Sequence, residues 1–297
     1  MIRLSLIIAT YNRAAQLVDT LRSVVAQEAD PATWECVVVD NNSQDDTAAR
    51  FAAFAAAHPG FRLRRVFEPR QGLSHARNRG IAESCGELVA IIDDDERIVP
   101  GFIGSYMAFF DARPDASVAG GPIVAEYPSG RPVWMSRWTE RPIANPMDFG
   151  REVRSFPADR IPGGGNMAFR RSVVDRFGAF DPALGRTGKR LIGGEETDFF
   201  DRLRRGGERI WYVPGAVMHH IIPPEKLTDA YFRRLCYNVG VSQRLQAGET
   251  GRRSLRLREA FKWLVTFALL FTMRPAQGRQ LLRMRREIGR GVFSREE

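Results

Sequence analysis

The chain has 297 residues, of which 44% are hydrophobic and 27% are charged. This length allows one large or two small domains with an ample core, and the composition excludes collagen-like, disordered and disulfide-scaffold classes. The formal net charge is +9, and it is concentrated in residues 251–297, which hold twelve Lys or Arg and four Glu.

The first half of the chain alternates short apolar runs with helical patterns, which is typical of βαβ units and of an α/β fold with a mostly parallel sheet flanked by helices. We expect strands at Leu4–Ala9, Cys36–Asp40, Arg62–Phe67 and Leu88–Asp93. The helices expected between them cover residues 14–28, 46–58 and 73–84. The first apolar run is too short for the core of a signal peptide, and the three cysteines form no CxxC pair. We therefore expect a cytoplasmic protein.

Three of these strands end in polar residues, at Thr10–Arg13, Asp40–Ser43 and Asp93–Glu96. A single Asp after a strand often only caps the next helix. Because ligands of open α/β sheets bind outside the carboxyl ends of the strands, three such loops together indicate a shared binding site.

The second half of the chain is less regular. Residues 127–161 show no clear period and are predicted to be loops. Further on we expect a short helix at 171–177, an acidic helix start within 193–206, a strand at 209–213 and a helix at 227–246. The apolar segment Trp263–Met273 has basic flanks and is shorter than the roughly 20 residues that cross a bilayer. It is predicted either to lie on an anionic membrane surface or to pack on the rest of the protein.

Four acidic residues, Asp93 to Glu96, follow directly after an apolar strand. Such a concentration of negative charge is costly unless a cation offsets the repulsion. Mg²⁺ and Mn²⁺ prefer carboxylate oxygens and usually bind through one or two carboxylates together with substrate phosphates. The sequence therefore predicts a divalent metal, Mn²⁺ or Mg²⁺, at this turn.

With these motifs the chain resembles a known family, the family 2 glycosyltransferases, which are inverting enzymes with the GT-A fold. Five motifs carry the resemblance in order: Ser5–Arg13, Val37–Ser43, Gly72–Gly80, Asp93–Pro100 and Gly194–Asp198. Each motif is weak alone, but their order and spacing make the resemblance strong. It implies a GT-A catalytic domain at 1–226, with a donor-binding half at 1–100 and an acceptor half at 101–226, followed by a helical, basic extension at 227–297.

The resemblance also implies roles in donor binding. Around the nucleoside it places Thr10, Tyr11, Arg13, Asp40 and Asn42, with Asp40 accepting a hydrogen bond from the base. Arg77 would reach the base or the diphosphate, a role that suits a permanently charged planar donor. Asp93 and Asp95 occupy the outer positions of the family's D-x-D motif, with Asp94 between them. Asp95 would bind the metal directly, and Asp93 would hold the ribose or a metal-bound water. The part of Glu96 stays open.

On the acceptor side, the family's acidic pair corresponds to Glu195 and Glu196. Inversion needs one carboxylate that deprotonates the acceptor hydroxyl. Glu196 aligns with the usual base, and Glu195 stays an alternative. Without the resemblance, the alternative is that both are helix-start carboxylates favoured by the helix dipole.

A glycine-rich turn and a histidine pair complete the resemblance. Gly164, Gly165 and Asn166 would line the donor sugar and the acceptor, because small residues let the backbone approach a sugar closely. His220 aligns better than His219 with a further metal ligand of some GT-A enzymes. Imidazole suits Mn²⁺ less well than oxygen does, so a structural or acceptor-side histidine is an equal alternative.

These features predict an inverting glycosyltransferase of the hexosyltransferase type in bacterial polysaccharide biosynthesis. It would move a sugar from a nucleotide-sugar donor, with a UDP-sugar favoured and a GDP-sugar as the alternative, to a saccharide or lipid-linked saccharide. The basic tail favours contact with the inner face of the cytoplasmic membrane, and nucleic acid is not an expected partner. Two other functions fit parts of the sequence. A sugar-phosphate nucleotidyltransferase would carry a glycine-rich Arg/Lys loop after the first strand, and a non-catalytic basic module would bind membrane or nucleic acid without the acidic loops.

Overall fold

The computed structural model describes residues 1–187 and 193–294. These residues form two compact units. The first contains residues 1–124, 147–187 and 195–221, and the second contains residues 125–146, 193–194 and 222–294. The last three residues of the predicted basic tail lie outside the described part of the chain.

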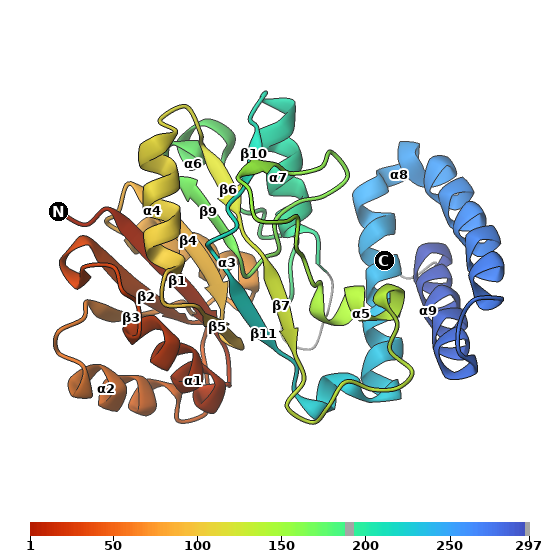
Figure 1. Cartoon of the computed structure of the whole chain (residues 1–297), viewed down its shortest axis with the longest axis horizontal. Coiled ribbons are helices and arrows are strands. Elements are labelled where there is room, and N and C mark those ends of the chain that lie inside the picture. Colours follow the sequence, from red (N-terminus) through yellow and green to blue (C-terminus); the bar gives the residue numbers. More distant parts are fainter. Residues whose placement is uncertain (188–192, 295–297) are drawn as a thin grey trace. The chain divides into compact units, whose positions relative to one another are not determined.

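The first unit is built on a sheet of eight strands in the order β3-β2-β1-β4-β9-β6-β10-β8 (Figure 1). The strands are β1 (Leu4–Thr10), β2 (Trp34–Asp40), β3 (Leu63–Phe67), β4 (Leu88–Asp93), β6 (Val118–Gly120), β8 (Arg154–Ser155), β9 (Met167–Arg170) and β10 (Ile210–Tyr212). β1 pairs in parallel with β2 and β4, and β9 runs antiparallel between β4 and β6. β1 and β2 are buried along their whole length, which explains their continuous apolar runs. The predicted α/β fold with a mostly parallel sheet is confirmed.

Helices cover this sheet at the places that the sequence predicts for the first half. The helices of the first unit are α1 (Ala14–Val25), α2 (Thr47–Ala57), α3 (Leu73–Glu83), α4 (Phe102–Ala112), α6 (Ser172–Phe177) and α7 (Glu195–Arg205). α3 packs on β1, β2 and β3. Gly80 permits this close approach, because a Cβ there would overlap the side chain of Ile7 and come within 3.1 Å of Val39.

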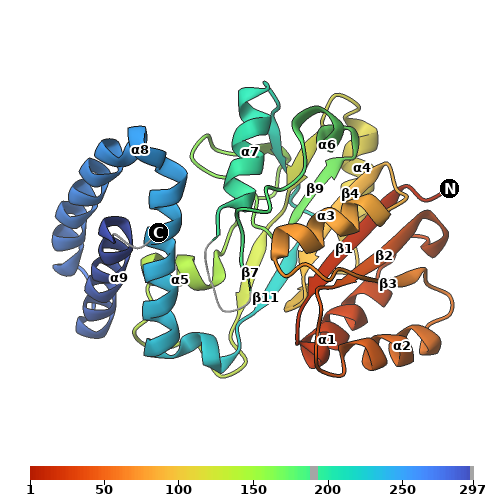
Figure 2. The same cartoon turned by 180° about the vertical axis from the view of Figure 1, so that it is seen from behind.

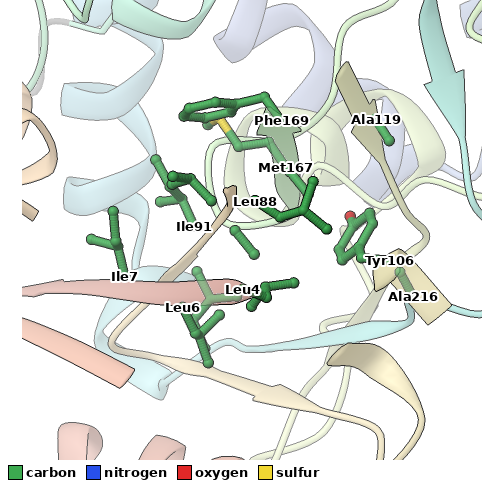
Figure 3. Packing of buried hydrophobic residues seen from close by; sticks show 14 of the residues in the cluster. Leu4, Leu6, Ile7, Leu88, Ile91, Tyr106, Ala119, Met167, Phe169 and Ala216 are labelled. Carbon is green, nitrogen blue, oxygen red and sulfur yellow. The ribbon is translucent and has the colours of Figure 1, made fainter. Parts of the chain in front are cut away.

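The core of the first unit fixes the strand ends that carry the candidate site. Side chains from β1, β4 and β9 pack against one another, as Figure 3 shows for Leu4, Leu6, Ile7, Leu88, Ile91, Met167 and Phe169. Since protein interiors are close-packed, strands held in this way have little freedom to slide. The loops that follow β1 and β4 therefore have fixed starting points.

A second, three-stranded sheet has the order β5-β11-β7. Its strands are β5 (Glu96–Ile98), β7 (Ile123–Glu126) and β11 (Met218–Ile221). β11 runs antiparallel to β5, with His220 opposite Glu96 and His219 opposite Arg97. This pairing brings a histidine from late in the chain to the acidic turn.

The region 127–161 was predicted to be loops, but it contains the helix α5 (Arg137–Ala144) and the short strand β8. Ser136 is the N-cap of α5, and the hydroxyls of Ser136 and Thr139 each accept a hydrogen bond from the other residue's backbone N–H. This capping box starts a helix of only eight residues that contains Pro142. Such a short segment gives too little periodicity to be identified, so the prediction was wrong here.

The second unit consists mainly of α8 (Asp229–Leu270) and α9 (Pro275–Phe293), which follow a 3-10 turn at Pro224–Leu227. α8 has two arms that meet at Gly248, where φ is 57° and ψ is −167°. α9 lies between the two arms in both views (Figures 1 and 2). The predicted helix at 227–246 is therefore only the first arm, and the apolar segment that begins at Trp263 belongs to the second. No helix among the described residues is both long and apolar enough to span a membrane.

Candidate active site

The loops that follow β1, β2 and β4 are joined by hydrogen bonds at the carboxyl edge of the sheet. The hydroxyl of Thr10 donates to Asp94 Oδ2 at 2.8 Å. The backbone N–H of Asn12 donates to Ser43 Oγ at 3.0 Å, which links the first two loops. The three polar strand ends that the sequence singled out therefore meet at one place.

The residues predicted to surround the nucleoside divide into two groups. Thr10 and Asp40 are buried, and Asp40 accepts hydrogen bonds from Ser43 N–H at 2.9 Å and Arg65 Nη1 at 3.0 Å. The other three predicted residues, Tyr11, Arg13 and Asn42, are at least partly open to solvent. The open side chains are those that a ligand can reach without rearrangement.

The acidic turn separates into three converging carboxylates and one that faces elsewhere. Ligand oxygens of Asp93, Asp95 and Glu96 lie within 4.8 Å of one another. Asp94 instead accepts hydrogen bonds from Thr10 and from Arg13 Nη1, the latter at 2.9 Å. Asp94 therefore braces the β1 loop, whereas its three neighbours form the candidate metal group.

Burial and mutual repulsion both raise the pKa values of carboxyl groups in the acidic turn. Burial and the nearby charges of Asp93 and Asp95 raise the pKa of Glu96 well above its usual value, although Glu96 accepts the backbone N–H of Asp93 at 2.8 Å. Burial also raises the pKa of Asp94 to about 6 despite the neighbouring Arg13. Within the candidate metal group, the charged form of Glu96 is therefore disfavoured, and a bound cation would offset the repulsion from Asp93 and Asp95.

His220 lies beside this group. Its Nε2 atom is 3.9 Å from Asp95 Oδ1, and the pairing of β11 with β5 sets this position. His219 is the neighbouring residue of the strand, opposite Arg97. Because successive side chains of a strand point to opposite faces, His220 rather than His219 is placed to join the acidic group.

Arg77 is completely buried and connects the acidic turn with the acidic pair. Its Nη1 atom is 2.9 Å from Glu196 Oε1 and 3.4 Å from Glu195 Oε1. Its Nη2 atom donates to Asp93 Oδ1 at 3.2 Å and to the Gly164 carbonyl at 3.1 Å. The guanidinium is held by these protein oxygens within the protein. Its expected contact with the base or the diphosphate stays a prediction.

The two glutamates of α7 have different environments. The side chain of Glu195 is 2% exposed, whereas that of Glu196 is 22% exposed. Burial and the charge of Glu196 raise the pKa of Glu195 to about 7, and its Oε2 atom has no hydrogen-bond partner in the described part of the chain. Burial alone would also raise the pKa of Glu196, but the charge of Arg77 and its hydrogen bond outweigh burial and lower it. Glu196 is the accessible and more readily ionised member of the pair.

The glycine-rich turn before β9 packs directly against carboxylates. A Cβ at Gly164 would overlap Glu196 and come within 2.8 Å of Arg77 Nη2. A Cβ at Gly165 would overlap the carboxylate of Glu96. Neither glycine has a positive φ. They are required because any Cβ at these positions would collide with a neighbouring side chain.

Asn166 is fully buried and its side chain is fully used within the protein. Its Oδ1 accepts from the hydroxyl of Tyr106 at 2.6 Å, and its Nδ2 donates to the carbonyls of Pro122 at 2.8 Å and Ala216 at 2.9 Å. Both polar atoms of this buried amide are therefore hydrogen-bonded within the protein. Asn166 therefore anchors the turn. The expected approach of this turn to the donor sugar and the acceptor stays a prediction.

One charged residue near the site was missed by the sequence analysis. Arg186 lies close enough to Glu195 and Glu196 that its charge lowers the pKa of both. Its backbone carbonyl accepts from Leu73 N–H at 2.9 Å, which ties it to the start of α3. A basic residue after Gly185, shortly before an acidic helix start, is the signal that could have indicated it.

Similarity to known proteins identifies the family of the chain. Residues 5–178, more than half of the chain, match the family described as glycosyl transferase family 2. The glucosyl-dolichyl phosphate glucuronosyltransferase of Haloferax volcanii is 26% identical over 233 residues, which are 73% of this chain and 69% of that protein. The succinoglycan biosynthesis protein ExoM of Rhizobium meliloti is 27% identical over 237 residues, 78% of this chain and 71% of its own length.

Among solved structures, the chain is similar to the mannosyltransferase PcManGT from Pyrobaculum calidifontis, solved in complex with GDP-Man and Mn²⁺. The TM-score is 0.64, and the match covers 99% of this chain and 88% of that one. At 19% sequence identity this likeness shows the fold alone. Together with the family match, it shows that the chain is a glycosyltransferase with a GT-A fold that belongs to glycosyl transferase family 2.

Proposed function

We propose that this glycosyltransferase carries out an inverting, metal-assisted transfer of a sugar from a nucleotide-sugar donor to a hydroxyl of a saccharide or lipid-linked saccharide. One observation carries the proposal. A group of three carboxylates, Asp93, Asp95 and Glu96, is joined through the buried Arg77 to the candidate base Glu196. The guanidinium of Arg77 thus holds both Asp93 on the donor side and Glu196 on the acceptor side. A single displacement needs the donor and the base in such a fixed arrangement.

The residues of the acidic turn fit a divalent ion such as Mn²⁺ or Mg²⁺. Carboxylate oxygens from Asp93, Asp95 and Glu96 converge, and the imidazole of His220 lies at 3.9 Å from Asp95. This donor set suits a hard divalent cation, with imidazole as a secondary ligand. The Mn²⁺ in the complex of PcManGT supports the same choice. When bound, the ion would stabilise the negative charge of the departing diphosphate.

The chain's own residues supply orientation and proton transfer. Glu196 takes the proton of the acceptor hydroxyl, and the charge of Arg77 keeps it ionised for this role. Arg77 also holds Asp93, so that the donor and acceptor sides keep a fixed separation. Tyr11, Arg13 and Asn42 are the open side chains at the strand ends and are assigned to the nucleoside.

The substrates are proposed from chemistry and from the relatives' names. We favour a UDP-sugar, with a GDP-sugar as the alternative. Uracil and guanine both carry a ring N–H group from which a carboxylate such as Asp40, at the end of β2, would accept a hydrogen bond. The Haloferax volcanii relative is named for glucosyl-dolichyl phosphate, a lipid-linked saccharide, which supports an acceptor of this class. Inverting chemistry follows from Glu196 acting as a base in one displacement.

A ligand panel tests the donor and metal assignments. We expect one nucleotide sugar among UDP-, GDP- and dTDP-sugars to raise the unfolding temperature by about 5 °C at about 100 times its Kd, and only when Mn²⁺ is present. Thermal shift assays with and without EDTA measure this. Equal stabilisation by the donor in EDTA would count against a metal-assisted site.

Adding a methyl group at Gly164 should disturb the base without unfolding the protein. In Gly164→Ala the new Cβ overlaps Glu196 and crowds Arg77, so the carboxylate must move. A displacement of about 1 Å at a reacting group lowers kcat by about 10²-fold. Steady-state kinetics measure this, with Gly104→Ala in α4 as the control because its Cβ meets nothing within 4 Å. Equal kcat values for both variants would show that the turn does not position the base.

A further inference from the structure

The second arm of α8 carries a continuous apolar face on its outer side. We call this the outer apolar face; it consists of Leu257, Phe261, Leu264, Val265, Phe267 and Phe271, whose exposed fractions run from 39% to 93%. Intervals of three and four residues place side chains on one side of a helix. An exposed patch of contiguous large apolar side chains indicates an interaction site.

The opposite side of the same arm packs against α9. Leu255 and Thr266 are buried, and Thr266 Oγ1 accepts a hydrogen bond from Arg285 of α9 at 3.2 Å. Figures 1 and 2 show α9 packed inside the arm, so that the outer side of the arm faces away from it. The core of the second unit includes Leu255 together with Leu281 and Met284 of α9. The outer apolar face is therefore not needed to hold its own unit together.

The exposed charges between residues 251 and 274 of this arm have one sign. The exposed ionisable residues from Gly251 to Arg274 are arginines: Arg252, Arg253, Arg256, Arg258 and Arg274. The one acidic residue of this segment, Glu259, is 2% exposed and is paired with Lys262 on the inner side. A surface that combines Phe and Leu with arginine, and that exposes no carboxylate from 251 to 274, is complementary to a layer of anionic head groups over hydrocarbon.

The arginines lie at the margins of the outer apolar face, where they can reach anionic head groups. At about 100° per residue, Arg256 and Arg258 lie on either side of Leu257, and Arg274 follows the last apolar residue, Phe271. Long arginine side chains can keep the guanidinium at the head groups while their carbon chains cover apolar surface. A helix with Phe and Leu on one face and arginines at its margins lies in the plane of the membrane interface.

We propose that the outer apolar face and its flanking arginines form a docking surface for an anionic phospholipid membrane, with the second arm of α8 lying flat in the interface. A protein partner is less well matched, because protein interfaces have a rim of mixed polar groups, whereas here Ser254 and Thr272 are the exposed uncharged polar residues between 251 and 274. The proposal does not depend on the identity of the donor, the metal or the base.

Vesicle binding by the full chain tests the proposal. We expect co-sedimentation with vesicles of phosphatidylcholine and phosphatidylglycerol, and about tenfold less with phosphatidylcholine alone. The variant Phe261→Ser/Leu264→Ser/Phe271→Ser should bind the anionic vesicles at least about tenfold more weakly. Val133→Ser, a change at a side chain that is 81% exposed elsewhere in the second unit, is the control and should bind normally.

A second pair of variants separates local charge from net charge. Arg253→Gln/Arg258→Gln removes two charges beside the outer apolar face and should weaken binding to anionic vesicles about tenfold. Arg62→Gln/Arg151→Gln removes two exposed charges from the first unit and should leave binding unchanged. Circular dichroism and unfolding temperatures confirm that all variants are folded.

Three outcomes would overturn the proposal. The first is undiminished vesicle binding by the folded triple serine variant. The second is an equal loss of binding for both arginine pairs, which would indicate only net charge. The third is a native chain that is dimeric in light scattering and a triple variant that is monomeric, because the outer apolar face would then be an interface between copies of the chain.

Discussion

Glu196→Gln should lower kcat about 10³-fold while the Kd for the nucleotide sugar stays within about twofold of native, because removal of a general base costs about 10²- to 10⁴-fold. The substitution keeps the shape of the side chain and one acceptor for Arg77 Nη1, which lies at 2.9 Å. It removes the negative charge of the carboxylate and, with that charge, the ability to take a proton. Initial rates and donor titration measure the two quantities on the same preparation.

The matched control is Glu195→Gln, one residue away on the same helix turn. Its carboxylate is almost completely buried, and its Oε1 atom is 3.4 Å from Arg77 Nη1. Geometry precedes pKa in the choice of a base, and a group that substrate cannot reach is a poor candidate even with a pKa near 7. We expect Glu195→Gln to lower kcat less than about tenfold. A greater loss in Glu195→Gln than in Glu196→Gln would reverse the assignment.

The pH profile of the native enzyme gives an independent test of the same assignment. A base must be deprotonated, so kcat/KM falls as the pH drops through its pKa. Because Arg77 lowers the pKa of Glu196, kcat/KM should stay level through neutral pH and fall only in the acid range. Since the pKa of Glu195 is raised to about 7, a decline centred there would point to Glu195 instead.

The meeting of the strand ends could be predicted because, in the first half of the chain, the local sequence pattern agrees with the fold. Continuous apolar runs ending in polar residues identify buried parallel strands, and the edge of a parallel sheet brings their ends together. The hydrogen bond from Thr10 to Asp94 confirms that the first and fourth strand ends meet. The fold and the family were therefore available from the sequence.

The direction of individual side chains was not available from the sequence. Four consecutive acidic residues appear equivalent in the sequence, yet Asp94 turns to Arg13 while Glu96 joins the metal group. This division depends on the turn after β4 and on the pairing of β5 with the distant β11. Burial of Arg77 likewise depends on how α3 packs, which no local pattern encodes. Long-range packing decides what the motif residues can touch.

The comparisons decide the class of reaction but leave finer predictions open. Membership of the family selects glycosyl transfer over nucleotidyl transfer and over a non-catalytic basic module. The donor base, the acceptor and the membrane contact stay predictions. The division into domains at 1–226 and 227–297 also stays a prediction.

Substitution of Asp95 should cause the second large loss of activity. Its two carboxylate oxygens face two different partners, His220 and Arg13. Its Oδ1 atom faces His220 at 3.9 Å, and its Oδ2 atom accepts from Arg13 Nη1 at 3.1 Å. Asp95→Asn keeps the size of the side chain and one oxygen for Arg13 but removes the charge that a divalent cation requires. The change therefore isolates metal binding from packing.

We expect Asp95→Asn to lower transfer about 10³-fold, which corresponds to about 4 kcal/mol of lost charge stabilisation at the departing diphosphate. Donor affinity measured by calorimetry in Mn²⁺ should fall to the value that the native chain shows in EDTA. Asp94→Asn is the matched control: its side chain faces Thr10 and Arg13, so the Mn²⁺ dependence of the rate should stay native even if the unfolding temperature falls. Native Mn²⁺ dependence in Asp95→Asn, or its loss only in Asp94→Asn, would place the cation elsewhere and remove the basis for the proposed transfer.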